Sequence, residues 1–181
     1  MKNLKRIPNI ITLIRLLLVP LFVFFFFSNI PNKKTVYLTI FIVSGISDVL
    51  DGYLARKFGW ESELGKILDP VADKATQLCV SVCVATMMKQ LMWVPIYQVV
   101  KDLLLICGAA GLFKRENIIV KSNWAGKLAS VIYYFTFLIL LFFDNELSYS
   151  LAQILCGFFV AFSVLAFVVY VNKYFNGKRK A

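Results

Sequence analysis

Six long apolar runs constrain the fold of this chain more than any other feature of its sequence. Of its 181 residues, 60% are hydrophobic, whereas soluble domains usually carry about 45–50% apolar residues. A run of roughly 20 apolar residues is long enough to cross a bilayer as an α-helix. The sequence therefore predicts an all-α integral membrane protein with six transmembrane helices, at residues 10–30, 35–56, 66–88, 91–113, 127–143 and 148–172.

The first run follows a basic segment, residues 1–6, that resembles the start of a signal peptide. However, the apolar run extends past Pro20 to Phe27 and no small-residue cleavage site follows it, so we expect a retained first helix. Pro8 indicates a break between a short N-terminal interfacial segment and this helix. Because the loops are short and no Gly/Ser/Pro-rich linker is present, we expect residues 1–181 to form a single transmembrane domain.

The basic residues are distributed unevenly between the two predicted faces of the membrane. If the six spans are correct, most of the 20 lysines and arginines lie on the same side as the N-terminus, and only Lys33, Lys34 and Lys89 lie on the other. Cytoplasmic loops carry the excess of basic residues, so we expect a multi-pass cell-membrane protein with both termini in the cytoplasm. The net charge of +10 is then explained by topology and by attraction to anionic lipids. No aromatic–basic platform indicates a nucleic-acid partner.

Four aspartates stand out in this apolar chain, because carboxylates near lipid are costly and are kept mainly where they bind, pair or react. Asp48 and Asp51 are three positions apart, and Asp69 and Asp73 are four apart, so each pair shares one face of a helix. A glycine and a candidate helix-starting serine between the pairs predict a reversal of the chain. Two consecutive antiparallel helices would then bring both pairs together at their cytoplasmic ends.

Clustered carboxylates repel one another, and a divalent cation relieves this repulsion. The chain contains no histidine, which excludes a Ser-His-Asp triad and argues against catalytic zinc. Ligation by oxygen atoms alone favours Mg²⁺, Mn²⁺ or Ca²⁺, and a magnesium site usually completes its shell with phosphate oxygens and water. The aspartates therefore indicate phosphate chemistry at the membrane surface.

Small residues and one arginine accompany the aspartates. Gly52, Ala55 and Gly65 would let a bulky ligand approach the backbone closely, or else they pack helices against one another. Arg56 offers a planar donor fork that suits a phosphate or a nucleobase edge.

The same stretch, residues 48–73, resembles the signature of the CDP-alcohol phosphatidyltransferases, D-x2-D-G-x2-A-R-x8-G-x3-D-x3-D, at every fixed position. The matching residues are Asp48, Asp51, Gly52, Ala55, Arg56, Gly65, Asp69 and Asp73. The family's fold also has six transmembrane helices, so the resemblance covers nearly the whole chain.

Members of this family exchange the CMP of a CDP-linked lipid for an acceptor alcohol. The resemblance implies CDP-diacylglycerol as donor, membrane lipids as partners, and a homodimer. It also implies that the four aspartates hold one or two Mg²⁺ or Mn²⁺ ions on the CDP pyrophosphate and that Asp73 takes the proton of the acceptor hydroxyl. The CDP pocket would be lined by Asp48, Gly52, Ala55, Arg56 and Gly65.

The first predicted helix resembles the start of two bacterial subgroups of the family, the phosphatidylglycerophosphate synthases and the related cardiolipin synthases. Asn9, Thr12 and Arg15 are spaced by three and share a helix face, and all three are candidates to bind a lipid or acceptor phosphate. An arginine inside an apolar helix needs a partner. For Arg15 this partner is a lipid or acceptor phosphate or, alternatively, one of the aspartates.

The second half of the chain departs from the first subgroup. Phosphatidylglycerophosphate synthases usually carry Arg-Glu in the fourth helix and Gly-Lys-x-Lys-Thr before the fifth, where this chain has Lys101-Asp102 and Gly126-Lys127-Leu-Ala-Ser. Lys101 and Lys127 are candidates to bind the phosphate of the acceptor, or else they are charges that set the topology.

Three functions remain open from the sequence. We expect glycerol 3-phosphate as the acceptor, on the likeness of the N-terminal half. The alternative is a cardiolipin synthase that uses phosphatidylglycerol. A magnesium-linked membrane transporter is an alternative of a different class, and it is disfavoured because the aspartates gather near one predicted membrane face instead of crossing the bilayer.

Overall fold

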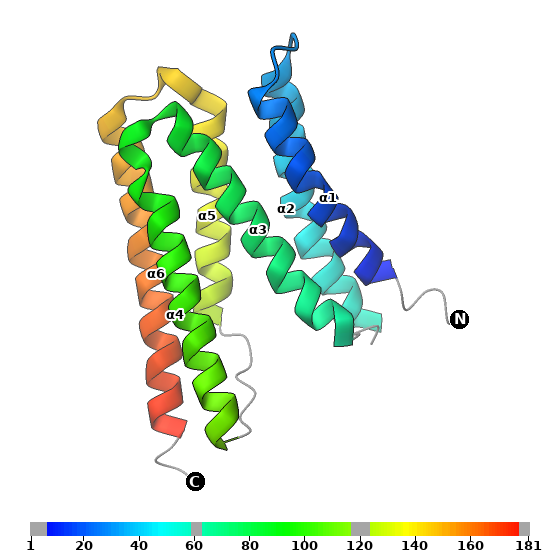
Figure 1. Ribbon diagram of the computed structural model, residues 1–181, viewed down its shortest axis with the longest axis vertical. Helices are drawn as coiled ribbons and strands as arrows, with labels where there is room; N and C mark the ends of the chain where they lie inside the picture. Colours follow the sequence, from blue (N-terminus) through cyan, green and yellow to red (C-terminus); the bar gives the residue numbers. More distant parts are fainter. Residues whose placement is uncertain (1–6, 59–62, 117–123, 178–181) are drawn as a thin grey trace. The chain divides into compact units, whose positions relative to one another are not determined.

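The computed structural model describes residues 7–58, 63–116 and 124–177. These residues form six α-helices and two short 3₁₀ turns and contain no strand (Figure 1). Each predicted apolar run corresponds to one α-helix, so the prediction of an all-helical fold is confirmed. The elements are α1 (Ile7–Phe27), α2 (Lys33–Phe58), α3 (Glu63–Met87), η2 (Lys89–Leu91), α4 (Trp93–Glu116), α5 (Trp124–Phe143), η3 (Asp144–Glu146) and α6 (Tyr149–Gly177).

Three of these helices are long and apolar enough to cross a membrane, as judged from length and composition. The spans are Ile10–Phe27 in α1, Gly126–Phe143 in α5 and Tyr149–Val169 in α6. Among the residues that the structure describes, no such span is found in α2, α3 or α4. The three apolar helices indicate a membrane protein, and the further prediction of six spans stays a prediction.

The predicted N-terminal interfacial segment lies outside the described ranges. Helix α1 begins at Ile7, so Pro8 lies in its first turn. Proline is tolerated there because the backbone N–H groups of the first turn have no partner within the helix.

The chain divides into two compact units, residues 1–84 and 85–181. In the first unit α1 and α2 lie side by side (Figure 1), joined by a tight reversal. Ser28 donates its backbone N–H to the carbonyl of Phe24 at 3.0 Å and its hydroxyl to that of Phe25 at 2.8 Å. These bonds satisfy carbonyl groups that the end of a helix otherwise leaves unpaired.

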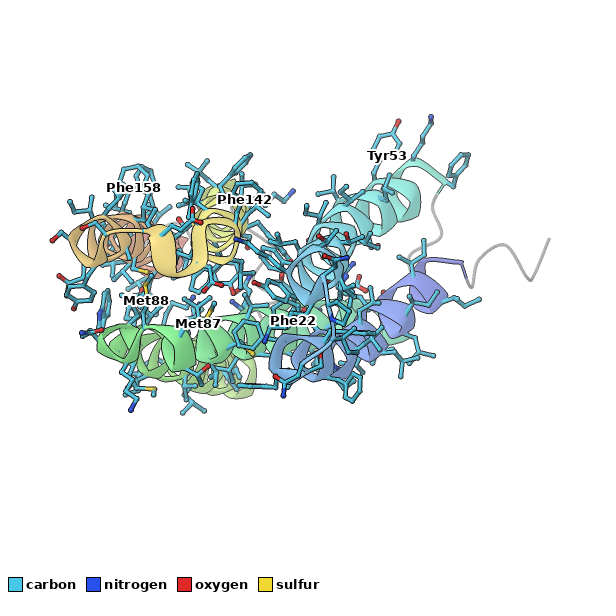
Figure 2. The ribbon with its side chains drawn as sticks, turned by 90° about the horizontal axis from the view of Figure 1, so that it is seen from above. Phe22, Tyr53, Met87, Met88, Phe142 and Phe158 are labelled. Atoms are coloured by element: carbon cyan, nitrogen blue, oxygen red, sulfur yellow. The ribbon has the colours of Figure 1, made fainter. Side chains whose placement is uncertain are left out.

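Four aromatic side chains form the core between α1 and α2. Phe22 and Phe26 of α1 pack against Tyr37 and Phe41 of α2, with ring centroids of 5.3–6.3 Å across the two helices. All four rings are buried, whereas Tyr53 farther along α2 projects outward (Figure 2). Aromatic pairs at such distances contribute beyond the area they bury. This aromatic core fixes how α1 lies on α2.

The second unit has an equivalent core between α5 and α6. The rings of Tyr133 and Phe137 stack at 4.2 Å, and Phe159 of α6 meets Tyr133 edge-on at 5.4 Å. The small side chains of Ala152 and Cys156 are fully buried on the same helix as Phe159. Small residues let membrane helices approach closely, so that dispersion contacts between them are numerous.

Replacing Phe22 by alanine is expected to destabilise the first unit, because it removes the ring that contacts three others in the aromatic core. Large-to-small changes of a buried aromatic side chain cost roughly 3–5 kcal/mol. Thermal unfolding of the detergent-solubilised protein should therefore begin at a clearly lower temperature. The matched control is Phe24→Ala on the same helix, where the side chain is largely exposed. An equal loss in both variants would contradict the packing assigned to Phe22.

Candidate functional site

The signature residues lie on two consecutive helices, as the sequence predicts. Asp48 and Asp51 belong to α2, and Asp69 and Asp73 belong to α3. Helix α2 ends at Phe58 and α3 begins at Glu63. Each aspartate pair is therefore presented by a single helix.

Asp48 is held by an arginine from the neighbouring helix. The guanidinium of Arg15 on α1 forms a hydrogen-bonded ion pair with Oδ1 of Asp48. The arginine side chain is fully buried, while the Asp48 side chain keeps 34% of its surface exposed. A buried guanidinium is stable only when it is paired and hydrogen-bonded. Of the two partners that the sequence leaves open for Arg15, the structure shows an aspartate.

Asp69 receives a second contact from α1. The hydroxyl of Thr12 donates a hydrogen bond to Oδ1 of Asp69 at 2.6 Å, the length typical of an O–H group bonded to a carboxylate. Thr12 is almost completely buried. Because Thr12 and Arg15 lie three positions apart, one face of α1 contacts the signature aspartates of both α2 and α3.

Asp73 is oriented within its own helix. Gln77, one turn further along α3, donates its side-chain N–H groups to both carboxylate oxygens of Asp73 at 3.1 Å. The Asp73 carboxyl also lies within range of charge repulsion from Asp48 and of attraction by Arg15. Carboxylates from α2 and α3 therefore share one electrostatic environment in the first unit.

These carboxylates have the donor chemistry of a site for Mg²⁺ or Mn²⁺. Asp48, Asp69 and Asp73 are all half-buried residues. Among the described side chains, no three carboxylates or thiols gather closely enough to ligate one ion. The side chain of Asp51 lies outside the described ones, and the four-carboxylate metal site stays a prediction.

The predicted CDP-pocket residues lie on the same two helices. Gly52, Ala55 and Arg56 follow Asp51 on α2, and the side chains of Ala55 and Arg56 lie outside those described, as does that of Asn9 on α1. Gly65 is buried in the first turn of α3.

Two of the candidate acceptor residues, Lys101 and Lys127, belong to the second unit. The ammonium group of Lys101 on α4 lies 3.3 Å from Oγ of Ser163 on α6 and 3.4 Å from Oδ1 of Asp102. It also lies 6.0 Å from the ring centroid of Tyr97. Only 13% of the Lys101 side chain is exposed. Lys127, in the first turn of α5, is exposed.

The sequence analysis missed Gln77, Tyr97 and Ser163. Gln77 follows Asp73 by four positions, which is the spacing of side chains that meet on a helix, so this contact was open to prediction. Tyr97 precedes Lys101 by the same interval. Ser163 offers only the weaker signal of a polar residue in an apolar helix, because its contact depends on how α4 and α6 pack.

Comparison with known proteins identifies the class to which this fold and signature belong. Residues 5–171 match the model of the CDP-alcohol phosphatidyltransferase family, and the chain belongs to that family.

Relatives within the family carry two kinds of name. The CDP-diacylglycerol–glycerol-3-phosphate 3-phosphatidyltransferase of Escherichia coli K12 is 31% identical over 128 residues, 67% of this chain and 69% of that protein. The Rickettsia typhi protein of the same name is 33% identical over 79 residues, 44% of each chain. A Schizosaccharomyces pombe protein, a cardiolipin synthase (CMP-forming) fused to a mitochondrial hydrolase, is 36% identical over 84 residues, 46% of this chain and 14% of that protein.

The extent of these matches differs between relatives. The chain spans less than half of the length of the Rickettsia relative and about two thirds of the Escherichia coli relative.

Proposed function

We propose that the protein transfers the phosphatidyl group of CDP-diacylglycerol to glycerol 3-phosphate, with release of CMP, as a step of phospholipid biosynthesis. The observation that carries this proposal is the complete family signature on α2 and α3. The acceptor is supported by the name of the Escherichia coli relative, whose match covers about two thirds of both chains.

The signature aspartates have the chemistry to hold the divalent ions of such a reaction. Asp48, Asp51, Asp69 and Asp73 would ligate one or two Mg²⁺ or Mn²⁺ ions, which, when bound, neutralise charge on the pyrophosphate and on the departing CMP. Gly52, Ala55, Arg56 and Gly65 would line the pocket for the CDP group, where the planar fork of Arg56 suits a phosphate or a base edge.

Asp73 is the proposed general base. The acceptor hydroxyl forms a new bond to the phosphorus of the phosphatidyl group, the bond from that phosphorus to CMP breaks, and the hydroxyl proton passes to Asp73. Gln77 supports this role because it donates to both oxygens of the carboxylate and so fixes its orientation. A positioned base of this kind contributes about 10²–10⁴-fold to a rate.

In this proposal the protein crosses the membrane six times, with both termini and the active site on the cytoplasmic side. Two copies form a homodimer. The three apolar helices support the membrane location. The excess of basic residues on one predicted face supports the orientation.

A cardiolipin synthase is the second candidate. It is favoured by the Lys101-Asp102 pair, which is nearer to the Arg-Asp of that subgroup, and by the name of the Schizosaccharomyces pombe relative. The transporter alternative has no observation in its favour beyond carboxylates in helices, and it leaves the signature unexplained.

The proposed function is tested by measuring CMP release from CDP-diacylglycerol with purified protein and one acceptor at a time. We expect release with glycerol 3-phosphate in the presence of Mg²⁺ or Mn²⁺, and none with phosphatidylglycerol, inositol phosphate or serine.

Two results of this assay would change the proposal. CMP release that depends on phosphatidylglycerol would show that the protein is a cardiolipin synthase and that glycerol 3-phosphate is not its acceptor. CMP release that persists in excess EDTA would exclude the proposed metal site, because the reaction would then proceed without a divalent ion.

Replacing Asp73 by asparagine should abolish turnover while binding of CDP-diacylglycerol is retained, because the amide keeps the shape of the side chain and loses its basicity. We expect kcat to fall by about 10²–10⁴-fold, measured as CMP release and compared with donor binding by calorimetry. Asp144→Asn in η3 makes the same chemical change outside the signature and should leave kcat unchanged. Turnover near the original rate in Asp73→Asn rules this residue out as the base.

Replacing Lys101 by alanine should raise KM for the acceptor roughly 10–150-fold and KM for CDP-diacylglycerol much less. The reason is that a charge-assisted hydrogen bond to a phosphate contributes roughly 1.5–3 kcal/mol. The exposed Lys89 of η2 provides the control, since Lys89→Ala removes the same charge elsewhere. Equal changes in both KM values would show that Lys101 supports the fold of the second unit and not the acceptor site.

A further inference from the structure

Helix α1 contributes none of the family signature, yet it contacts the signature aspartates of both other helices in its unit. Arg15 pairs with Asp48 on α2, and Thr12 donates to Asp69 on α3. The two contacts join residues 33 and 57 positions apart in the chain. They are therefore products of tertiary packing.

The hydroxyl of Thr12 makes a contact that the hydroxyls of Thr39 and Thr76 do not make. A threonine inside a helix usually donates to the carbonyl of its own helix one turn earlier. Thr39 on α2 and Thr76 on α3 do so, at 2.7 Å to Thr35 and 2.9 Å to Ala72. Thr12 donates across to a carboxylate on another helix, at the shorter distance of 2.6 Å.

This bond constrains the Asp69 carboxylate. A hydroxyl that donates to Oδ1 fixes the rotation of the carboxylate about its last bond, and it leaves the other oxygen to act as a ligand. Because the donor residue Thr12 is buried, the bond lies in less polar surroundings than one between two surface groups and is stronger than such a bond.

Arg15 acts on Asp48 in a similar way and adds charge. Its side chain is fully buried, while about a third of the Asp48 side chain is exposed. The exposed member of the pair is therefore the aspartate. The planar fork of arginine sets the angle of the bond as well as the charge, which a lysine ammonium does not.

We propose that Thr12 and Arg15 are positioning residues of the metal site, which orient Asp69 and Asp48 so that α1 sets the affinity of the site for its divalent ion. This inference rests on the proposed function, since it takes the signature aspartates as ligands. Side chains that hold metal ligands in place typically change metal affinity 10–100-fold when they are removed.

The test is a titration of the purified, substrate-free protein with Mn²⁺, followed by the loss of the electron paramagnetic resonance signal of the free ion. Thr12→Val keeps the shape of the side chain and removes the hydroxyl. We expect its Mn²⁺ affinity to fall at least tenfold. The separate variant Thr12→Ser should bind Mn²⁺ as tightly as the unmodified protein, because serine supplies the same hydroxyl.

Thr76→Val is the matched control for Thr12→Val. It removes a buried hydroxyl of the same unit that donates to a carbonyl of its own helix, and it should leave Mn²⁺ affinity unchanged. If Thr12→Val does not fold, Thr12→Ala makes the same chemical deletion without added apolar volume. Unchanged affinity in the folded hydroxyl-free variant overturns the role of Thr12.

Arg15→Lys separates orientation from charge. It retains the positive charge and loses the fork, so an orienting role predicts weaker Mn²⁺ binding. Affinity equal to that of the unmodified protein would overturn the orienting role of Arg15 and leave only charge neutralisation.

Asp69→Asn distinguishes a failure of this inference from a failure of the proposed function. If Asp69→Asn binds Mn²⁺ as tightly as the unmodified protein, the signature carboxylate is not a ligand and the proposed metal site fails. If Asp69→Asn loses binding while Thr12→Val keeps it, the metal site stands and only the positioning role fails.

Discussion

The pairing of charge in a weakly polar interior is the constraint on which the first unit depends. A buried guanidinium without a partner would destabilise the protein by several kcal/mol, so Arg15 requires a carboxylate where it lies, and Asp48 supplies it. The same requirement places Thr12 beside Asp69 and Gln77 beside Asp73. The contacts of α1 thus connect it to both other helices: moving α2 removes the carboxylate that pairs with Arg15, and moving α3 removes the carboxylate that accepts from Thr12.

The parts of this structure that follow from local sequence were predictable. Six apolar runs predict six helices, and spacings of three and four place each aspartate pair on one helix. The side chains that contact these aspartates were less predictable. Both a lipid phosphate and an aspartate satisfy the charge of Arg15, and only the packing of α1 on α2 decides between them. The bond from Thr12 to Asp69 joins residues 57 positions apart, and no periodicity of the sequence encodes that distance.

The two units divide the residues of the proposed reaction between them. All the residues proposed for the donor and the metal belong to residues 1–84, whereas Lys101 and Lys127 belong to residues 85–181. The donor signature is complete, and the departures from the pattern of phosphatidylglycerophosphate synthases fall in the second unit. Such a division would allow the acceptor to change while the donor chemistry stays the same, and the relatives of this chain carry the names of two different enzymes.

The aromatic core of α1 and α2 has a consequence for the length of α1. Thr12, Arg15, Phe22 and Phe26 fall on a single stripe of this helix, since Arg15 and Phe22 are separated by about two turns. One end of the stripe binds carboxylates and the other packs against Tyr37 and Phe41. Inserting one residue between Arg15 and Phe22 would rotate the two ends by ~100° relative to each other, so both sets of contacts could not form at once. The number of residues between Arg15 and Phe22 is therefore as constrained as the identity of these two side chains. This constraint comes from packing and does not depend on contact with a substrate.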